Sequence, residues 1–392
     1  MHVIWRPPLL HTEISEEKER KVTWLELFYD LVYVATVIQL GNLLSHNVSW
    51  LGFLEFIALF IPIWWSWTGI TFYMNRFVVD DIWHRLLIFA QIFAIATMGL
   101  SIQGAFTDLS GQFALCYVII RVLLILMYVR AWFHVESSRS VTWGFIQGFS
   151  ISALFWLISA FVPTPFNYIL WAIGMAVDMA TPFLPNIRKY LQQTPAHLEH
   201  MAERYGIFTI IVLGESFIKI VSQDAAVAMT WPIFLFSCSG LIVTYGLWWL
   251  YFDDVADSHV VVNKTRSMFV WVYSHLPLAI GITAFGVAAK KLIFSDLSKV
   301  AKPEYLWLYA GAIILYLVFV ALIDEVTERE DGALRNDRRA IWRFGAAGGV
   351  LLIAIFGATW TPTQVVTGVA ILFVIQILVD LPWRGWKETS VE

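Results

Sequence analysis

Long apolar stretches recur along this chain, and they restrict its fold more than any other feature. Windows of about 17–25 residues that are apolar enough to cross a membrane as helices occur about twelve times. We expect spans at approximately 24–44, 51–74, 82–105, 112–133, 143–161, 166–185, 203–222, 232–252, 266–289, 304–324, 340–357 and 362–380. The sequence therefore predicts an all-α fold, a polytopic membrane helix bundle.

Composition supports this fold class and excludes several others. Of the 392 residues 59% are hydrophobic and 14% charged, whereas a soluble domain has about 25% charged residues. The net charge of −4 gives no sign of a nucleic-acid partner. Cys116 and Cys238 both fall inside apolar spans, which argues against a disulfide framework or a cysteine zinc site. The polar, acidic segment before the first span is unlike a signal peptide, so we expect that span to direct insertion.

Basic residues alternate along the connections between the expected spans. The loops at 45–50, 106–111, 162–165, 223–231 and 358–361 contain neither Lys nor Arg, whereas the connections between them and both tails contain several. Because cytoplasmic loops are enriched in Lys and Arg, this pattern predicts twelve spans with both termini in the cytoplasm. One loop departs from it. Segment 290–303 carries Lys290, Lys291, Lys299 and Lys302 on the predicted outer side.

A weak internal repeat divides the chain into two halves. Leu27-Phe28 corresponds to Ile207-Phe208, Trp64-Trp65 to Trp248-Trp249, and Gln91 to His275, at nearly constant spacing. Transporters commonly use parallel repeats with a site at their interface. The predicted organisation is a cytoplasmic tail (1–22), a first half of about six helices (23–186), a cytoplasmic linker (187–202), a similar second half (203–381) and a C-terminal tail (382–392).

The seventh expected span carries a carboxylate near its centre. If this span starts near Tyr205, Glu215 lies ~15 Å along the axis, about half of a ~30 Å hydrocarbon core. Lys219 follows at i+4 in the favourable order for an ion pair. The pair could merely help the helix to pack. Alternatively it forms a substrate or proton site, the usual reason for an ionisable group inside a membrane.

Other interior polar residues are further candidates for this site. Arg121 lies in the middle of the fourth span and must find a partner. His275 precedes Pro277, so it is either a proton relay beside a weakened helix or part of a packing kink. In the internal repeat, Gln91 of the first half corresponds to His275 of the second half. The candidate partners of Arg121 are Glu215, Glu26, Asp30 and Asp178.

A second set of polar residues lies near the predicted cytoplasmic ends of the helices. Glu26 and Asp30 share one face of the first span, and two adjacent carboxylates require a proton or a cation between them. Arg85, Arg204 or a transported ion could supply it, although the helix N-terminus alone favours such charge. The predicted cytoplasmic gate consists of Glu26, Asp30, Asn75, Arg76, His200, Glu203 and Arg204. His197, His200 and Glu203 have a spacing that could hold a metal ion, but their segment offers too few further ligands to predict a metal site.

Several of these motifs together resemble the bacterial low temperature requirement protein A (LtrA) family. The resemblance rests on Trp24-Leu-Glu26-Leu-Phe-Tyr-Asp30-Leu-Val, Phe72-Tyr-x-Asn75-Arg76, His200-x-x-Glu203-Arg204-Tyr-Gly-Ile-Phe with Leu213-Gly214-Glu215, Trp248-Trp249-x-Tyr251-Phe252-Asp253 and His275-x-Pro277. It extends over roughly residues 20–380. It implies a multi-pass plasma-membrane protein of a family named for a cold-growth phenotype, and it assigns neither substrate nor reaction.

The leading functional hypothesis is a secondary transporter or permease for a small solute or proton. Glu215, Arg121 and His275 would form its midplane site, with Lys219 and Gln91 as further candidates. The alternatives are an intramembrane lipid-modifying enzyme, for which nucleophile and metal motifs are missing, and a non-catalytic scaffold or sensor. We expect no cofactor and no metal. Membrane lipids are the expected partners, and the oligomeric state stays open.

Overall fold

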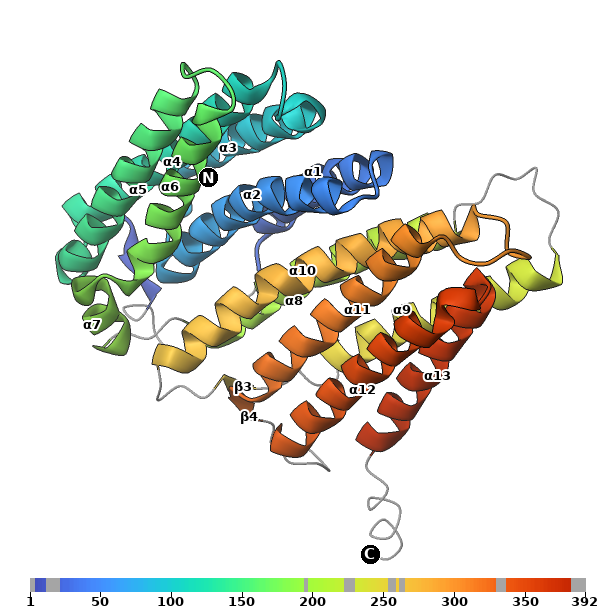
Figure 1. Ribbon diagram of the computed structural model, residues 1–392. Helices are drawn as coiled ribbons and strands as arrows, with labels where there is room; N and C mark the ends of the chain where they lie inside the picture. The colour runs from blue at the N-terminus through green and yellow to red at the C-terminus, as the bar shows by residue number, and fades with distance from the viewer. Residues whose placement is uncertain are drawn as a thin grey trace, which may run out of the picture. The chain divides into compact units, whose positions relative to one another are not determined.

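The protein is folded almost entirely into α-helices. The structure, a computed structural model, describes residues 4–11, 22–193, 197–221, 230–252, 259–260, 265–328 and 336–381. These residues contain thirteen α-helices and four two-residue strands, most of which are labelled in Figure 1. The helices are α1 (Trp24–His46), α2 (Trp50–Arg76), α3 (Ile82–Ser101), α4 (Ser110–His134), α5 (Arg139–Ser159), α6 (Phe166–Ala180), α7 (Pro185–Gln193), α8 (Leu198–Val221), α9 (Trp231–Tyr251), α10 (Thr265–Ile293), α11 (Pro303–Asp324), α12 (Asn336–Phe356) and α13 (Pro362–Asp380).

Ten of these helices are long and apolar enough to cross a membrane, namely α1 to α5 and α9 to α13. The predicted fold class, an all-α polytopic membrane bundle, is therefore confirmed. The short α6 and α7 meet at a bend of 45° and together provide an eleventh candidate span. Helix α8 is 24 residues long but carries Glu203, Arg204, Glu215 and Lys219 among its apolar residues. The total of about twelve spans stays a prediction.

Contacts between Cα atoms divide the chain into two compact units. Unit 1 comprises residues 1–43 and 54–208, and unit 2 comprises residues 44–53 and 209–392. The division falls inside α8, between residues 208 and 209, and the predicted start of the second half at residue 203 lies in the same helix. In unit 1, α3, α4, α5 and α6 pack in sequential order. In unit 2, α10, α11, α12 and α13 do the same, and α9 packs on α13. The internal repeat stays a prediction.

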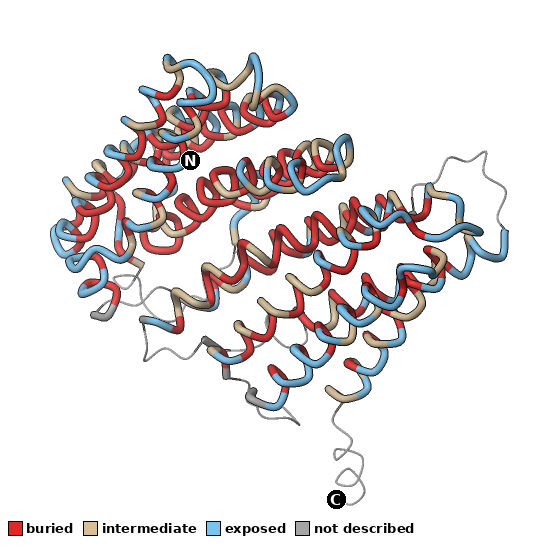
Figure 2. The backbone as a smooth tube through the Cα atoms, viewed as in Figure 1, coloured by how far each residue is buried: buried red, intermediate tan, exposed pale blue. Residues whose placement is uncertain are grey.

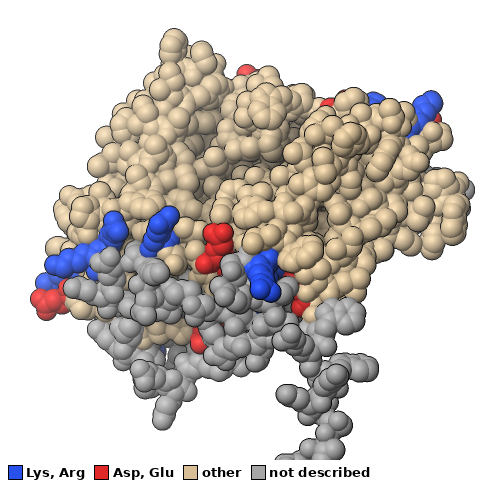
Figure 3. Space-filling view, turned by 60° about the horizontal axis from the view of Figure 1, so that its bottom comes forward, with Lys and Arg blue, Asp and Glu red and all other residues tan. Residues whose placement is uncertain are grey.

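The surface of the helices is what a lipid environment requires. Most helices have a buried stripe and an exposed stripe, whereas α10 is buried along most of its length (Figure 2). The exposed stripes carry large apolar side chains, such as Phe93 at 76% and Leu100 at 77% exposure on α3. Figure 3 shows wide areas of visible surface without charge and charged side chains gathered mainly along one rim. A soluble protein rarely exposes such extensive apolar patches.

Two short antiparallel strand pairs brace the ends of the helices. In unit 1, β1 (Leu9–Leu10) pairs with β2 (Phe77–Val78), which directly follows α2. In unit 2, β3 (His259–Val260) pairs with β4 (Thr327–Glu328). Asp81 caps α3 by accepting a 2.8 Å hydrogen bond from the His84 amide. These contacts fix the ends of α2 and α3, beside the polar residues described next.

Candidate functional site

A buried ion cluster joins α1 to α8 in unit 1. Arg204 donates from Nε to Asp30 Oδ2 at 3.0 Å and from one terminal nitrogen to Asp30 Oδ1 at 2.6 Å. Its other terminal nitrogen lies 3.3 Å from Glu26 Oε1. Such a forked contact is the strongest form of acid–arginine hydrogen bonding. The side chain of Arg204 is fully buried, so the two neighbouring carboxylates of α1 share a guanidinium, as the i, i+4 spacing suggested.

The same carboxylates contact a histidine and a tryptophan. His200, one turn before Arg204 on α8, places Nε2 at 3.4 Å from Glu26 Oε1. Trp67 of α2 donates from its indole nitrogen to Asp30 Oδ1 at 2.7 Å. We call Glu26, Asp30, His200 and Arg204 the Glu26–Arg204 cluster. It places a titratable imidazole against a carboxylate that an arginine also contacts.

The three remaining predicted gate residues, Asn75, Arg76 and Glu203, make separate contacts. Asn75 of α2 donates to the His197 carbonyl at 2.7 Å and accepts from the His197 amide at 3.0 Å. It therefore ties the start of α8 to the end of α2. Glu203 is exposed and accepts from the Val22 amide at 3.3 Å. Arg76 is buried elsewhere, with its guanidinium 5.1 Å from the centre of the Tyr190 ring on α7.

A cavity of about 660 Å³ reaches the cluster at Glu26. The ends of α1, α2 and α3 line it, and its wall includes Met74, whose sulfur lies 3.5 Å from a terminal nitrogen of Arg204. The exposed ion pair between Asp80 and Arg85, 2.8 Å apart, also lines it. Since these two residues are open to water, the cavity connects the aqueous edge of unit 1 with a carboxylate of the buried cluster.

Beside the cavity, Asp81 closes a second acid–arginine contact. It accepts from the Arg6 amide at 2.8 Å and from the Arg130 guanidinium. Burial raises the pKa of Asp81, but the hydrogen bonds from Arg130, His84 and Arg6 outweigh it and lower the pKa below the usual value. This carboxylate therefore stays ionised and holds the N-terminal segment against α3 and α4.

Arg121, which lies in the middle of the fourth expected span, pairs with Asp178. Its Nε lies 2.8 Å from Asp178 Oδ2, and both side chains are fully buried. Tyr117 accepts from Arg121 at 2.6 Å and donates to the same carboxylate. The rings of Tyr117 and Phe149 lie about 5 Å from the guanidinium. Of the four carboxylates considered for Arg121, the structure selects Asp178, and the result is a neutral pair that joins α4 to α6.

Gln91 belongs to a row of buried polar side chains in unit 1. Its Oε1 accepts from the Tyr29 hydroxyl at 2.7 Å, and that hydroxyl lies 3.2 Å from the hydroxyl of Tyr33. The Tyr33 hydroxyl in turn lies 3.0 Å from Ser66 Oγ. The row therefore links α3, α1 and α2. Tyr29 directly precedes Asp30 in α1, so the row begins close to the Glu26–Arg204 cluster along this helix.

The other predicted site residues belong to unit 2, where each has a local partner. Glu215 and Lys219 form the expected pair at 3.3 Å on α8. His275 Nδ1 lies 2.7 Å from the Trp271 carbonyl, so this nitrogen carries the proton and Nε2 accepts from the Tyr251 hydroxyl at 3.0 Å. Helix α10 continues through Pro277 without a break. The two interpretations of His275, a proton relay beside a weakened helix and part of a packing kink, both stay predictions.

A buried arginine in unit 2 escaped the sequence analysis. Arg343 of α12 lies 3.3 Å from Asp324 of α11 and 2.8 Å from Asp380 of α13. It also donates to Gln376 at 3.3 Å. Arg343 lies inside the expected span 340–357, about two turns after the start of α12, and an arginine in that position is the signal that would have found it. The hydrogen bond from Trp67 to Asp30 has no signature in the sequence.

These sites offer acids, bases and hydrogen-bond donors. Among the residues that the structure describes, no three His, Cys, Asp or Glu side chains gather as metal ligands. The Glu26–Arg204 cluster can bind or release a proton, because an imidazole lies against one of the two carboxylates that share the guanidinium. Arg121–Asp178 and Glu215–Lys219 are paired one to one.

Comparison with known proteins agrees with this architecture. Residues 21–379 match the family model described as bacterial low temperature requirement A protein (LtrA). The chain is also similar to Uncharacterized protein RA0937 of Rhizobium meliloti (strain 1021), with 29% identity over 283 residues, 68% of this chain and 69% of that protein. The family match spans every helix from α1 to α13. This multi-pass helical membrane protein therefore belongs to the LtrA family.

Proposed function

We propose that the protein is a secondary transporter or permease for a small solute, with the Glu26–Arg204 cluster as its proton or solute site. One observation carries this proposal. Glu26 contacts both His200 and Arg204 inside the protein, and the same residue lines the cavity of about 660 Å³ that reaches exposed residues. A site for exchange with water needs this combination of a buried charge and a path to it.

The energetics of the cluster favour a functional role over packing. Moving a charged group from water into a protein interior costs several kcal/mol per ion. Buried ion pairs are often replaceable by apolar side chains without loss of stability. Here two acids, an arginine, a histidine and an indole donor meet at one point, more than is needed to hold α1 against α8. Protonation of His200 or Glu26 would change how tightly Arg204 is held, which is how a local charge change biases two states of a protein.

The residues predicted for a midplane site enter this proposal in a second role. Glu215, Lys219, His275 and Gln91 stay candidates for the path of the solute, and Arg121 serves the integrity of unit 1 through Asp178. We propose that both termini lie in the cytoplasm, from the distribution of basic residues, and that the membrane is the plasma membrane, as membership of the LtrA family implies. The cavity at Glu26 would then open to the cytoplasm.

A ligand screen with paired variants tests the proposed function. The purified full-length chain is heated in detergent with amino acids, amines, organic anions and lipids at several pH values, as wild type, Glu26→Gln and Glu136→Gln. Glu136 is an exposed glutamate of unit 1, with 86% side-chain exposure, and serves as the matched control. A solute at a hundredfold excess over its Kd stabilises the folded state by ~2.7 kcal/mol. We expect a soluble hit that is lost only in a folded Glu26→Gln protein.

Flux measurements then separate transport from the alternatives. Proteoliposomes with a trapped pH indicator should show solute-driven proton movement for wild type and Glu136→Gln, and none for Glu26→Gln. If Glu26→Gln binds and carries the hit as wild type does, the site is elsewhere. If no solute stabilises any variant and Glu26→Gln only lowers the melting temperature, the protein is a scaffold or sensor. A changed lipid profile in a deletion strain would favour the lipid-modifying enzyme.

Topology has its own test. In a cysteine-free background, Ser298→Cys should react with a membrane-impermeant maleimide on intact cells, because loop 290–303 lies on the predicted outer side. Asp80→Cys should react only after the cells are opened. Both positions are exposed, so burial does not prevent labelling. The reverse pattern would invert the predicted orientation.

A further inference from the structure

The lysine segment, residues 290–303 of unit 2, is not explained by the proposed function. It carries Lys290, Lys291, Lys299 and Lys302, the departure from the charge pattern of the other outer loops. Lys290, Lys299 and Lys302 are exposed. Within the segment, Asp296 is the single acid. A positively charged surface on the predicted outer side therefore requires a reason of its own.

The backbone of the lysine segment is held in one conformation. Ser298 donates from its amide at 3.1 Å and from its hydroxyl at 2.6 Å to Asp296 Oδ1. These bonds, with the nearby Lys299 ammonium, lower the pKa of Asp296 to about 2. The Ala301 amide donates to the Trp360 carbonyl at 2.9 Å, which ties the segment to the connection between α12 and α13. The carboxylate of Asp296 is thus bound by residues of the turn itself, and the lysines extend from a backbone that these hydrogen bonds hold.

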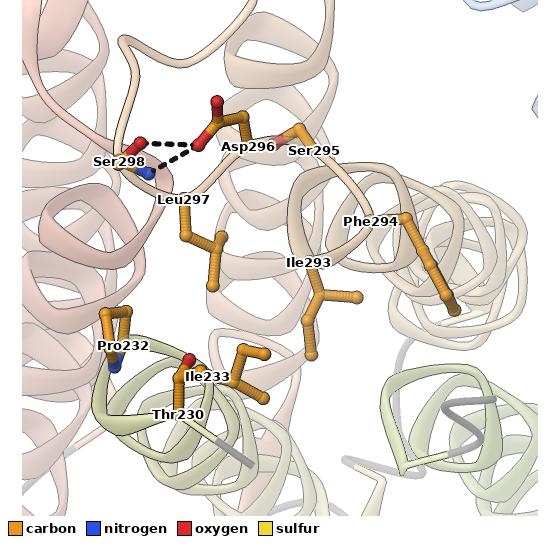
Figure 4. Close-up of a pocket in the computed structure, with 9 residues that line it drawn as sticks. All are labelled: Thr230, Pro232, Ile233, Ile293, Phe294, Ser295, Asp296, Leu297 and Ser298. Carbon is orange, nitrogen blue, oxygen red and sulfur yellow. Dashed lines mark hydrogen bonds between the residues drawn. The ribbon is translucent and has the colours of Figure 1, made fainter. Parts of the chain in front are cut away.

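A cavity of about 380 Å³ lies beside these lysines. The start of α9 (Thr230, Pro232 and Ile233) forms one wall, and residues 293–298 at the end of α10 form the other. In Figure 4, Ile293 and Leu297 point across the cavity toward Ile233. Asp296 lies at the opposite rim with Ser298. The cavity therefore has an apolar interior and a polar rim.

Exposed aromatic rings flank the same region. Trp231 is 73% exposed at the start of α9, Phe294 is 49% exposed at the end of α10, and Trp307 is 50% exposed near the start of α11. Tryptophan rings gather at the level of lipid headgroups. The N-terminus of α9 adds backbone N–H groups without helical partners, where Thr230 makes no side-chain cap. The rings place this cavity at the boundary between membrane and water.

We propose that the lysine segment and this cavity bind an anionic phospholipid. The lysines would contact its headgroup phosphate, and an acyl chain would enter between Ile233, Ile293 and Leu297. The argument is charge complementarity, since lysines near a membrane surface attract anionic lipids, about fivefold in affinity per residue. A purely solvated charged loop would need neither the apolar cavity nor the flanking rings. The proposal does not depend on the function of the Glu26–Arg204 cluster.

The test is a titration of the full-length chain in detergent with dioctanoyl phosphatidylglycerol and, separately, dioctanoyl phosphatidylcholine. Melting temperature and tryptophan fluorescence are the readouts. Phosphatidylglycerol should raise the melting temperature of wild type, and phosphatidylcholine should have a much smaller effect. A triple variant, Lys290→Gln with Lys299→Gln and Lys302→Gln, should bind phosphatidylglycerol at least tenfold more weakly. The matched control removes three exposed basic residues of unit 1, Arg139, Arg188 and Lys189, and should bind as wild type does.

Two further arms make the outcome decisive. Ile233→Trp fills the cavity and keeps every lysine, so it should weaken phosphatidylglycerol binding without a change of charge. Inorganic phosphate at the same concentration should not stabilise the wild type. The proposal is overturned if both lipids stabilise equally, if either the lysine triple or Ile233→Trp binds as wild type does, if the control triple loses binding too, or if inorganic phosphate replaces the lipid.

Discussion

Each unit of the protein buries one arginine between two carboxylates, and the two arrangements differ in one respect. In unit 1 both acids, Glu26 and Asp30, come from α1, and Arg204 comes from α8. In unit 2 the acids come from two helices, so Arg343 joins α11, α12 and α13. Loss of the Arg204 ion pairs removes a contact between two helices, whereas loss of the Arg343 ion pairs removes contacts among three helices.

The comparison shows how similar ion clusters can suit different roles. The unit 1 cluster includes His200 and adjoins a cavity at Glu26, so its charge can change when a proton or solute arrives. The unit 2 cluster adds the amide of Gln376, which has no charge to lose. We therefore expect the first to control function and the second to hold the fold. The predictions below test this difference.

The largest effect is expected from removal of each arginine. Arg204→Met and Arg343→Met both leave buried carboxylates without a guanidinium, which destabilises a protein by about 3–5 kcal/mol. The measurement is the melting temperature in detergent. The comparison depends on second-site variants. Adding Asp30→Asn and Glu26→Gln to Arg204→Met should restore most of the stability, but this triple variant should still show no solute flux. Adding Asp324→Asn and Asp380→Asn to Arg343→Met should restore both the stability and the solute flux. Flux in the repaired unit 1 variant would break the distinction.

Neutral replacements of single acids give the next effect. Glu26→Gln keeps the shape of the side chain and should abolish the pH dependence of solute binding, at a cost of about 1–3 kcal/mol in stability, because it weakens hydrogen bonds to charged groups. Asp380→Asn should lose similar stability and leave the pH dependence unchanged. Binding of the hit from the ligand screen, measured between pH 5 and 8, decides between them. An equal pH profile in both variants would mean that neither cluster is the proton site.

The hydrogen bond from Trp67 offers a finer test within unit 1. Trp67→Phe keeps the ring and removes the donor to Asp30, so we expect a loss of about 1.5–3 kcal/mol, the usual size for a bond to a charged group. Trp24→Phe is the control, because Trp24 is 88% exposed. Melting temperatures of the two variants in the same detergent give the answer. Equal values would show that the indole donor contributes nothing to the cluster.

The smallest effect concerns Asp81, an acid–arginine contact at the helix ends. Its pKa is lowered in the folded protein, so its stabilisation is fully present above the pKa of the unfolded chain, ~3.9, and is lost as pH falls through the folded value. The stability difference between wild type and Asp81→Asn should therefore be constant above about pH 5 and shrink below pH 4. Denaturation between pH 3 and 7 measures it. A difference that grows toward acid would contradict the ionised contact.

Local patterns in the sequence predicted much of the architecture. Apolar windows of about 20 residues identify spanning helices because length and composition alone satisfy the bilayer. The i, i+4 spacing placed Glu26 beside Asp30 and Glu215 beside Lys219, since residues four apart share one helix face. At Pro277 the sequence left a proton relay and a packing kink open, and the mostly buried α10 continues through this proline.

Partner choice between helices was decided by the tertiary structure alone. Asp30 and Arg204 lie 174 residues apart in the chain, and no pattern in either helix indicates the rotation and depth at which the other will pack. For the same reason the sequence left four acids open for Arg121 and overlooked the three-helix contact of Arg343. The sequence by itself determined which helices form and which polar residues they must hide. Only the packed structure decided which of those residues meet, because helix periodicity is local and ion pairing between helices depends on their placement in space.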